Sequence, residues 1–158
     1  MPPTSESKPG RRLIGIGNEF RCDDAAGLVI ARRLAELLLP NLDVVQHLGD
    51  GAALMDLWPG VTEVIVVDAV RSGAPPGTVF RIDAIKETIP TEFFSYSTHA
   101  FSLAEAIEVS RRLDQLPPRL FIYGIEGADF SAGQNLSREV SAAIETLVEE
   151  LSRRLSVG

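Results

Sequence analysis

Five short apolar runs along the chain have the length and composition of β-strands. Most of their residues are Val, Ile, Leu or other apolar types, and turn-forming residues lie between them. The strands are predicted over residues 12–17 (RLIGIG), 42–48, 63–70 (EVIVVDAV), 78–84 and 119–125 (RLFIYGI). Only the turn over residues 71–77 (RSGAPPG) separates the third run from the fourth, so the fourth strand is expected to lie antiparallel to its predecessor.

Longer segments with apolar residues three or four positions apart predict helices between and after these strands. Asp23 is a plausible N-cap for the first helix, and Ser102 with Glu105 forms a capping-box pattern. The predicted helices cover residues 23–39, 51–58, 102–116 and a C-terminal segment in which Val140, Ala143, Ile144, Leu147, Val148, Leu151 and Leu155 follow the helical period.

The alternation of strands and helices indicates an α/β fold. Such a chain forms a mostly parallel sheet with helices on both faces. Its 158 residues fit one domain, which we expect over residues 12–158. The preceding residues 1–11 (MPPTSESKPGR) are polar and rich in proline, which is typical of a disordered tail.

Charge and cysteine content narrow the possible partners and compartments. The formal net charge is −7, and an acidic chain repels phosphate backbones, so no nucleic-acid partner is expected. No apolar run approaches the ~20 residues of a membrane-spanning helix, and the N-terminus lacks the apolar core of a signal peptide. The one cysteine, Cys22, favours a reducing compartment. We therefore expect a cytoplasmic protein.

Candidate chemistry lies where parallel strands end, because ligands of open α/β sheets bind beyond the carboxyl ends of the strands. One histidine, His99, precedes the Ser102 cap, and several acids follow predicted strands. The polar residues at these positions are Asn18, Glu19, Cys22, Asp23, Asp24, Asp68, His99, Glu126 and Asp129.

Three of these residues combine into a metal-binding hypothesis, and each also has a structural interpretation. Asp24 adds a second acid where one cap suffices, although both acids also favour the helix dipole. Asp68 interrupts an apolar run, where a carboxylate needs a loop amide, Arg71 or a cation as its partner. His99 lies in a loop and is either structural or a ligand. Two carboxylates and an imidazole suit a borderline divalent metal.

Other residues are weaker candidates. The glycine loop at residues 15–18 lacks the third glycine of a dinucleotide fingerprint, since Phe20 occupies that position. Cys22 and His99 form a conceivable nucleophilic pair, but neighbouring carboxylates disfavour a thiolate. His47 lies within a strand pattern, where we interpret it as a filler residue.

Four blocks of sequence resemble the maturation protease family of the nickel–iron hydrogenases. The first is the run GIGNEFRCDDAAG at residues 15–27. The second is VDAV at residues 67–70, followed by Gly73 and by Pro76-Gly77. The third is Ser97-Thr98-His99 and the fourth is Gly124-Ile125-Glu126. These blocks occur in the family's order and span roughly the whole predicted domain.

The resemblance implies a phosphorylase/hydrolase-like three-layer α/β/α sandwich with a five-stranded, mostly parallel sheet and one antiparallel strand. It implies an endopeptidase that removes a C-terminal extension from a hydrogenase large-subunit precursor. In the family an acid, an aspartate and a histidine contact metal, and they correspond to Asp24, Asp68 and His99. The metal is nickel already inserted in the substrate, and either Asp24 or Asp68 is a candidate general base.

The chain departs from the family pattern at three positions. Asp24 replaces a frequent glutamate, Asp50 stands where threonine is common, and Gly127 stands where proline is commoner. Residues 49–51 and the aromatic loop 87–96 (ETIPTEFFSY) are candidate partner contacts.

Three alternative functions stay open at the level of sequence. They are a non-cleaving chaperone for the nickel-loaded subunit, a small metallohydrolase with its own metal, and a hydrolase that uses Cys22.

Overall fold

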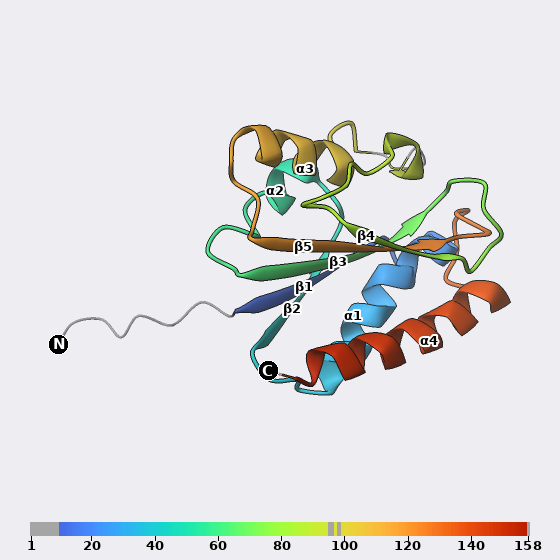
Figure 1. Ribbon diagram of the computed structural model, residues 1–158. Coiled ribbons are helices and arrows are strands. Elements are labelled where there is room, and N and C mark those ends of the chain that lie inside the picture. Colours follow the sequence, from blue (N-terminus) through green and yellow to red (C-terminus); the bar gives the residue numbers. More distant parts are fainter. Residues whose placement is uncertain (1–9, 95–96, 98, 158) are drawn as a thin grey trace.

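The computed structural model describes residues 10–94, 97 and 99–157 as three layers around one sheet (Figure 1). The five strands lie in the order β2-β1-β3-β5-β4. Their bounds are Arg11–Ile16 (β1), Leu42–His47 (β2), Glu63–Val70 (β3), Val79–Asp83 (β4) and Arg119–Glu126 (β5). The predicted α/β sandwich with one antiparallel strand is confirmed.

The antiparallel strand pairs with a different neighbour from the one expected. β4 pairs with β5, and β5 lies between β4 and β3. The turn over residues 71–77 therefore carries the chain past β5 to the sheet edge. The other pairs, β1 with β2, β1 with β3 and β3 with β5, are parallel.

In the described part of the chain, four α-helices cover the sheet, two on each face. Their bounds are Ala26–Glu36 (α1), Gly51–Leu54 (α2), Leu103–Arg112 (α3) and Arg138–Leu155 (α4), with 3-10 helices η1 (Cys22–Ala25) and η2 (Thr91–Phe94). Figure 1 shows α1 and α4 below the sheet and α2 and α3 above it. The capping box at Ser102 is confirmed, but α3 ends at Arg112 rather than Leu116. The chain then turns through Asp114, whose φ is +55°.

Successive side chains of the central strands point to opposite faces of the sheet and pack into two separate hydrophobic cores. Along β3, Ile65, Val67 and Ala69 pack with α1 and α4, and all seven periodic residues of α4 are buried in that core. Val64, Val66 and Val70 belong to the second core, which includes Trp58 and the buried apolar residues of α3. The period of two along a strand therefore places Asp68 on the α3 side of the sheet.

The chain enters the sheet slightly earlier than predicted. The Gly10 carbonyl accepts hydrogen bonds from the N–H groups of Thr62 and Glu63, at 3.1 and 3.0 Å, and β1 begins at Arg11. Residues 1–9 of the predicted tail lie outside the described part of the chain. In residues 10–94, 97 and 99–157, no helix is long and apolar enough to cross a membrane.

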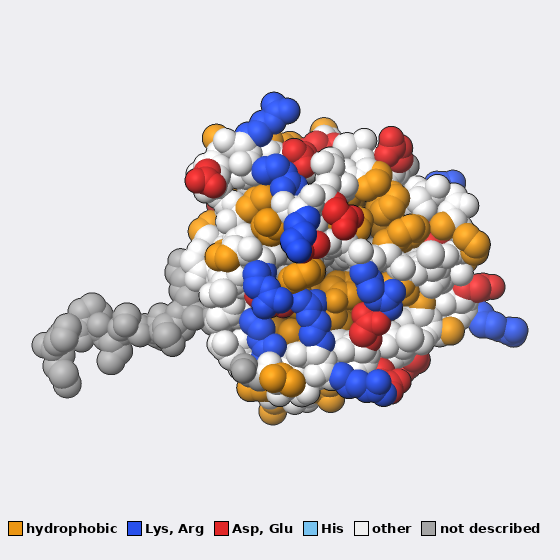
Figure 2. Space-filling model, in the orientation of Figure 1, with side chains coloured by type: hydrophobic (Ala, Val, Ile, Leu, Met, Phe, Trp, Pro, Cys, Tyr) orange, Lys and Arg blue, Asp and Glu red, His pale blue; other side chains and the backbone are white. Residues whose placement is uncertain are grey.

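The amino-terminal ends of β3 and β5 carry a buried acid with two arginine partners. Glu63 forms ion pairs with Arg154 at 2.8 Å and with Arg119 at 3.0 Å. The Arg154 guanidinium also lies 4.4 Å from the centre of the Phe121 ring, a cation–π contact. In the view of Figure 2, Lys and Arg side chains gather around apolar ones near the middle of the molecule. The ion pair between Arg154 and Glu63 therefore fixes helix α4 to the sheet by charge, in addition to the packing of its apolar face.

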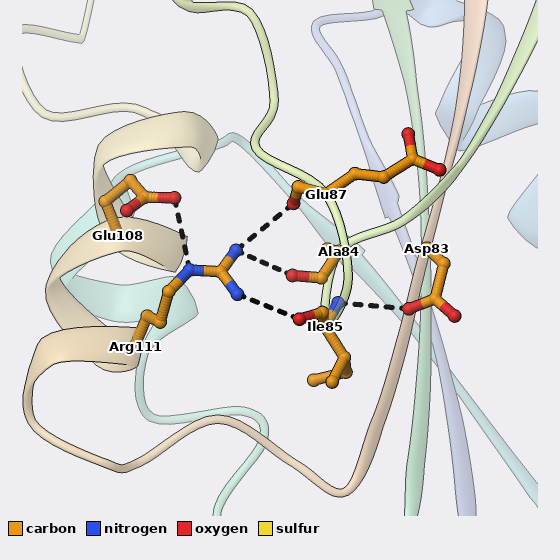
Figure 3. A network of polar contacts seen from close by, with 6 residues as sticks. All are labelled: Asp83, Ala84, Ile85, Glu87, Glu108 and Arg111. Atoms are coloured by element: carbon orange, nitrogen blue, oxygen red, sulfur yellow. Dashed lines mark hydrogen bonds and ion pairs between the residues drawn. The ribbon is translucent and has the colours of Figure 1, made fainter.

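Arg111 joins α3 to the segment that leaves β4 (Figure 3). Its guanidinium donates hydrogen bonds to the main-chain carbonyls of Ala84, Ile85 and Glu87, at 2.6, 3.2 and 3.3 Å. It also contacts Glu108 of the same helix at 3.3 Å. One cation thus satisfies three carbonyls that no strand or helix would satisfy.

We predict that Arg111→Met lowers the free energy of unfolding by about 1–3 kcal/mol, because three carbonyls lose a charged donor. Arg112→Met is the matched control, since Arg112 is the next residue and is exposed. Its effect should stay within about 0.5 kcal/mol. Urea denaturation of the wild type and the two variants measures both changes in unfolding free energy. Equal midpoints for the wild type and Arg111→Met would show that the carbonyl contacts add nothing to stability.

Candidate active site

A cavity of about 220 Å³ lies at the carboxyl ends of β1 and β3, on the side of the sheet that α3 covers. Asp24, Asp68 and His99 line it, together with Asn18, Arg21 and other residues. The three residues selected from the sequence therefore lie around one cavity, although 44 and 31 positions separate them along the chain.

Two aspartates reach this cavity from neighbouring strand ends. Asp68 lies near the end of β3 and is only 4% exposed. Asp24 lies in η1, directly after the loop that follows β1, and is 7% exposed. Buried acids that line a cavity are typical of functional sites, so the positions of Asp24 and Asp68 favour a functional role over a surface one.

The glycines of the first sequence block allow η1 and α1 to approach the strands. A Cβ at Gly17 would lie 2.1 Å from the carbonyl oxygen of Asp24. A Cβ at Gly27 would lie 2.3 Å from the carbonyl oxygens of both Ile16 and Val67. These distances are too short for any side chain, so only glycine permits the contact that holds Asp24 at the strand end.

His99 belongs to a small network around the turn that follows β2. Its Nε2 lies 3.1 Å from the carbonyl oxygen of Leu48. A carbonyl can only accept, so Nε2 carries the proton and Nδ1 carries the lone pair in the neutral ring. The backbone N–H of His99 donates to Ser97 Oγ at 3.2 Å. The imidazole is thus oriented by the turn at residues 48–49.

His47 supports the same turn from the other side, which corrects its interpretation as a filler residue. Its Nδ1 accepts a hydrogen bond from the N–H of Gly49 at 2.8 Å. Burial lowers the pKa of His47, Asp50 opposes that shift, and His99 adds to it. The neutral form of His47 is therefore the one that holds the turn.

Across residues 10–94, 97 and 99–157, no group of three or more His, Cys, Asp or Glu side chains is arranged to hold a metal ion.

A sequence model described as hydrogenase maturation protease matches residues 29–154. The chain belongs to this family. The matched segment contains Asp68 and His99 and begins after Asp24.

Individual relatives agree with this assignment. A Methanocaldococcus jannaschii protein assigned as a hydrogenase maturation protease is 29% identical over 143 residues, which cover 87% of this chain and 90% of that protein. The hydrogenase maturating endopeptidase HybD from Escherichia coli superposes with a TM-score of 0.71 and 25% identity, over 92% of this chain and 91% of its own. A solution structure of an Escherichia coli endopeptidase gives a TM-score of 0.78 and 26% identity over the same shares. The protein is therefore a peptidase.

Asp23 does not cap a helix in this protease, so that prediction is wrong. Helix α1 begins after Ala25, with no side-chain cap. The Asp23 side chain is fully buried and accepts three backbone N–H groups of the segment after β5. They belong to Ala128, Asp129 and Ser137, at 2.8, 3.0 and 2.8 Å. Asp23 thus fixes the loop between β5 and α4.

Glu126 and Asp129 also serve loops and do not line the cavity. Glu126 accepts hydrogen bonds from the N–H groups of Ser72 and Gly73 and from the Ser72 hydroxyl, at 2.9, 3.0 and 2.7 Å. Asp129 accepts from the hydroxyl and N–H of Ser131, and these bonds lower its pKa. Some acids at this edge of the sheet therefore line the cavity, and others accept hydrogen bonds that hold the surrounding loops.

Two of the departures from the family pattern have local explanations. The Asp50 side chain accepts from the N–H of Ala52 at 3.2 Å and caps α2. The Gly127 N–H donates to the Val70 carbonyl at 3.0 Å, a hydrogen bond that proline could not make.

Cys22 is buried and does not line the cavity with His99, so the nucleophilic pair does not form in this arrangement. Its sulfur lies 3.0 Å from where a Cβ of Gly133 would be.

The two described phenylalanines of the aromatic loop before His99, a candidate partner contact, are not exposed. Phe94 is 5% exposed and belongs to the core, and the Phe93 ring lies 4.8 Å from that of Phe80. Tyr96 lies outside the described residues.

Asp23→Asn should destabilise the protease by about 1–3 kcal/mol, because the amide keeps one acceptor oxygen and turns an NH₂ group toward N–H donors. Asp56→Asn, at an exposed position, is the control and should change little. Urea denaturation provides the comparison. Identical unfolding curves for the two variants would contradict the role assigned to Asp23.

The lowered pKa of His47 predicts a pH dependence of stability. The unfolded chain binds this proton more tightly than the folded chain, so the stabilising contribution is present above the ordinary pKa of 6.5 and is lost as the pH falls below it. His47→Gln should therefore flatten the decline of unfolding free energy on the acid side of pH 6.5. Parallel declines in the two proteins would assign the effect to other groups.

Proposed function

We propose that this protease removes a C-terminal extension from the nickel-loaded large-subunit precursor of a nickel–iron hydrogenase. The observation that carries the proposal is that three separate segments bring Asp24, Asp68 and His99 to one cavity. The named relatives act in hydrogenase maturation, which supports a hydrogenase subunit as the substrate. A cytoplasmic location belongs to the same proposal and is supported by the single cysteine.

In this proposal nickel arrives with the substrate and serves as a recognition element. Carboxylate and imidazole ligands suit nickel, and three of them can add to a metal that the substrate already holds in part. The Leu48 carbonyl supports this role, because it holds the proton on Nε2 of His99 and leaves Nδ1 as the nitrogen able to bind a metal. Binding then depends on the metal, and cleavage follows only after loading.

Hydrolysis also needs a group that takes a proton from water. Asp24 and Asp68 are the two candidates in the cavity, and we propose that one of them acts as the general base while the water oxygen attacks the scissile carbonyl. The proton then passes to the departing amide nitrogen. With an aspartate as the general base, the protease is aspartic in type, and nickel takes no part in breaking the peptide bond.

The test is a processing assay with purified precursor in nickel-loaded and nickel-free forms, read by mass spectrometry. We expect loss of a discrete C-terminal peptide from the loaded form only. Asp24→Asn, Asp68→Asn and His99→Gln should each slow cleavage by about 100-fold or more, with Asp56→Asn unaffected. Equal cleavage of both precursors would contradict nickel recognition, and full activity in both cavity aspartate variants would contradict the catalytic assignment.

A further inference from the structure

Arg21 is a half-buried cation of the active-site cavity that sequence reasoning did not select. Across residues 10–94, 97 and 99–157, four arginines make no side-chain hydrogen bond or ion pair: Arg21, Arg71, Arg112 and Arg138. The last three are exposed to solvent, where water satisfies a guanidinium. Arg21 alone among these four lines the cavity.

The backbone around Arg21 is held firmly, so its side chain starts from a fixed point. The Phe20 carbonyl accepts from the N–H of Gly133 at 2.8 Å, and the N–H of Cys22 donates to the Gly133 carbonyl at 2.9 Å. The Arg21 N–H donates to the Asn18 carbonyl at 3.2 Å, and its own carbonyl accepts from Asp24 at 3.1 Å. These four hydrogen bonds bracket Arg21 on both sides, so its backbone loses little further entropy when the side chain binds a ligand.

Among the described residues, the nearby acids form no ion pair with Arg21. Asp24 and Asp68 line the same cavity, but in the described part of the chain no carboxylate lies within ion-pair distance of the Arg21 guanidinium. A guanidinium is a planar fork of donors that matches a carboxylate in two parallel hydrogen bonds. A partly desolvated arginine that has no side-chain partner among the described residues is therefore suited to an anionic group that arrives with the ligand.

We propose that Arg21 binds a carboxylate of the substrate polypeptide and contributes to substrate specificity. This inference rests on the proposed function, since it takes the C-terminal extension as the ligand. The carboxylate has two possible sources, an acidic side chain near the cut site or the free C-terminus of the extension. Arg21 acts on substrate binding, and Asp24, Asp68 and His99 act on the metal and the peptide bond.

The experiment measures processing kinetics on nickel-loaded precursor for wild type, Arg21→Lys, Arg21→Met and the control Arg112→Met. Loss of a charged hydrogen-bonded pair should raise KM roughly 10- to 100-fold in Arg21→Met, with a smaller change in kcat. Arg21→Lys should recover part of the affinity because it keeps the charge without the fork. An unchanged KM in Arg21→Met would overturn the proposal.

Substrate variants separate the two sources of the carboxylate from a purely structural role. In one arm, acidic residues of the extension are changed to amides. In the other, a synthetic extension with an amidated C-terminus is ligated to the precursor. The arm that removes the carboxylate bound by Arg21 should raise the KM of the wild type and leave the KM of Arg21→Met unchanged. Equal effects of both arms on the two enzymes would mean that Arg21 only offsets the charge of Asp24 and Asp68.

A binding measurement keeps this inference distinct from the proposed function. Calorimetric titration uses the synthetic extension peptide, in free-acid and amidated forms, and needs no cleavage. If wild type cleaves no precursor, the proposed function fails, whereas peptide binding that requires both Arg21 and a carboxylate still supports the inference. Binding that is insensitive to Arg21→Met overturns it.

Discussion

The close contact between the first strand and the segment that follows it sets the geometry of the active site. Gly17 packs against the carbonyl of Asp24, and Gly27 packs against main-chain oxygens of β1 and β3. A methyl group at either position would push η1 and α1 away from the sheet by a large part of its own diameter. Asp24 would then leave the cavity that it shares with Asp68. The glycines of the first sequence block are therefore a packing requirement of the site rather than a phosphate-binding device.

The neighbouring acids Asp23 and Asp24 show how one dipeptide can serve both stability and chemistry. Asp23 is buried in full, and three backbone N–H groups offset the cost of desolvating its carboxylate. Glu126 likewise accepts hydrogen bonds from backbone N–H groups of the loop after β3. Both acids hold loops at the sheet edge, and this support leaves Asp24 and Asp68 as the acids of the cavity. Removing either loop acid would disturb the site without touching a reacting group.

The sequence predicts the sheet, and it selects three residues that line one cavity, because both inferences start from local patterns. The run EVIVVDAV identifies a strand buried on both faces, and its period of two places Asp68 opposite the residues that pack on α4. The partners of Asp23 are main-chain amides more than 100 positions away, and such donors have no side-chain signature in the sequence. The insertion of β5 between β3 and β4 is equally non-local. The early end of α3 depends on Asp114, which adopts a left-handed turn within an otherwise helical pattern.

The cavity contains groups of both signs, and this mixture bears on how a maturation protease chooses its substrate. The carboxylates of Asp24 and Asp68 and the lone pair of His99 attract a cation, whereas Arg21 attracts an anion. A peptide with acidic groups alone meets two like charges, and a free metal ion meets the guanidinium. A polypeptide that presents a bound metal and a carboxylate together satisfies both sets of groups at once. Under the proposed function, selectivity for the loaded precursor follows from this opposition, because a metal ion alone or a metal-free peptide contacts only one of the two sets of groups.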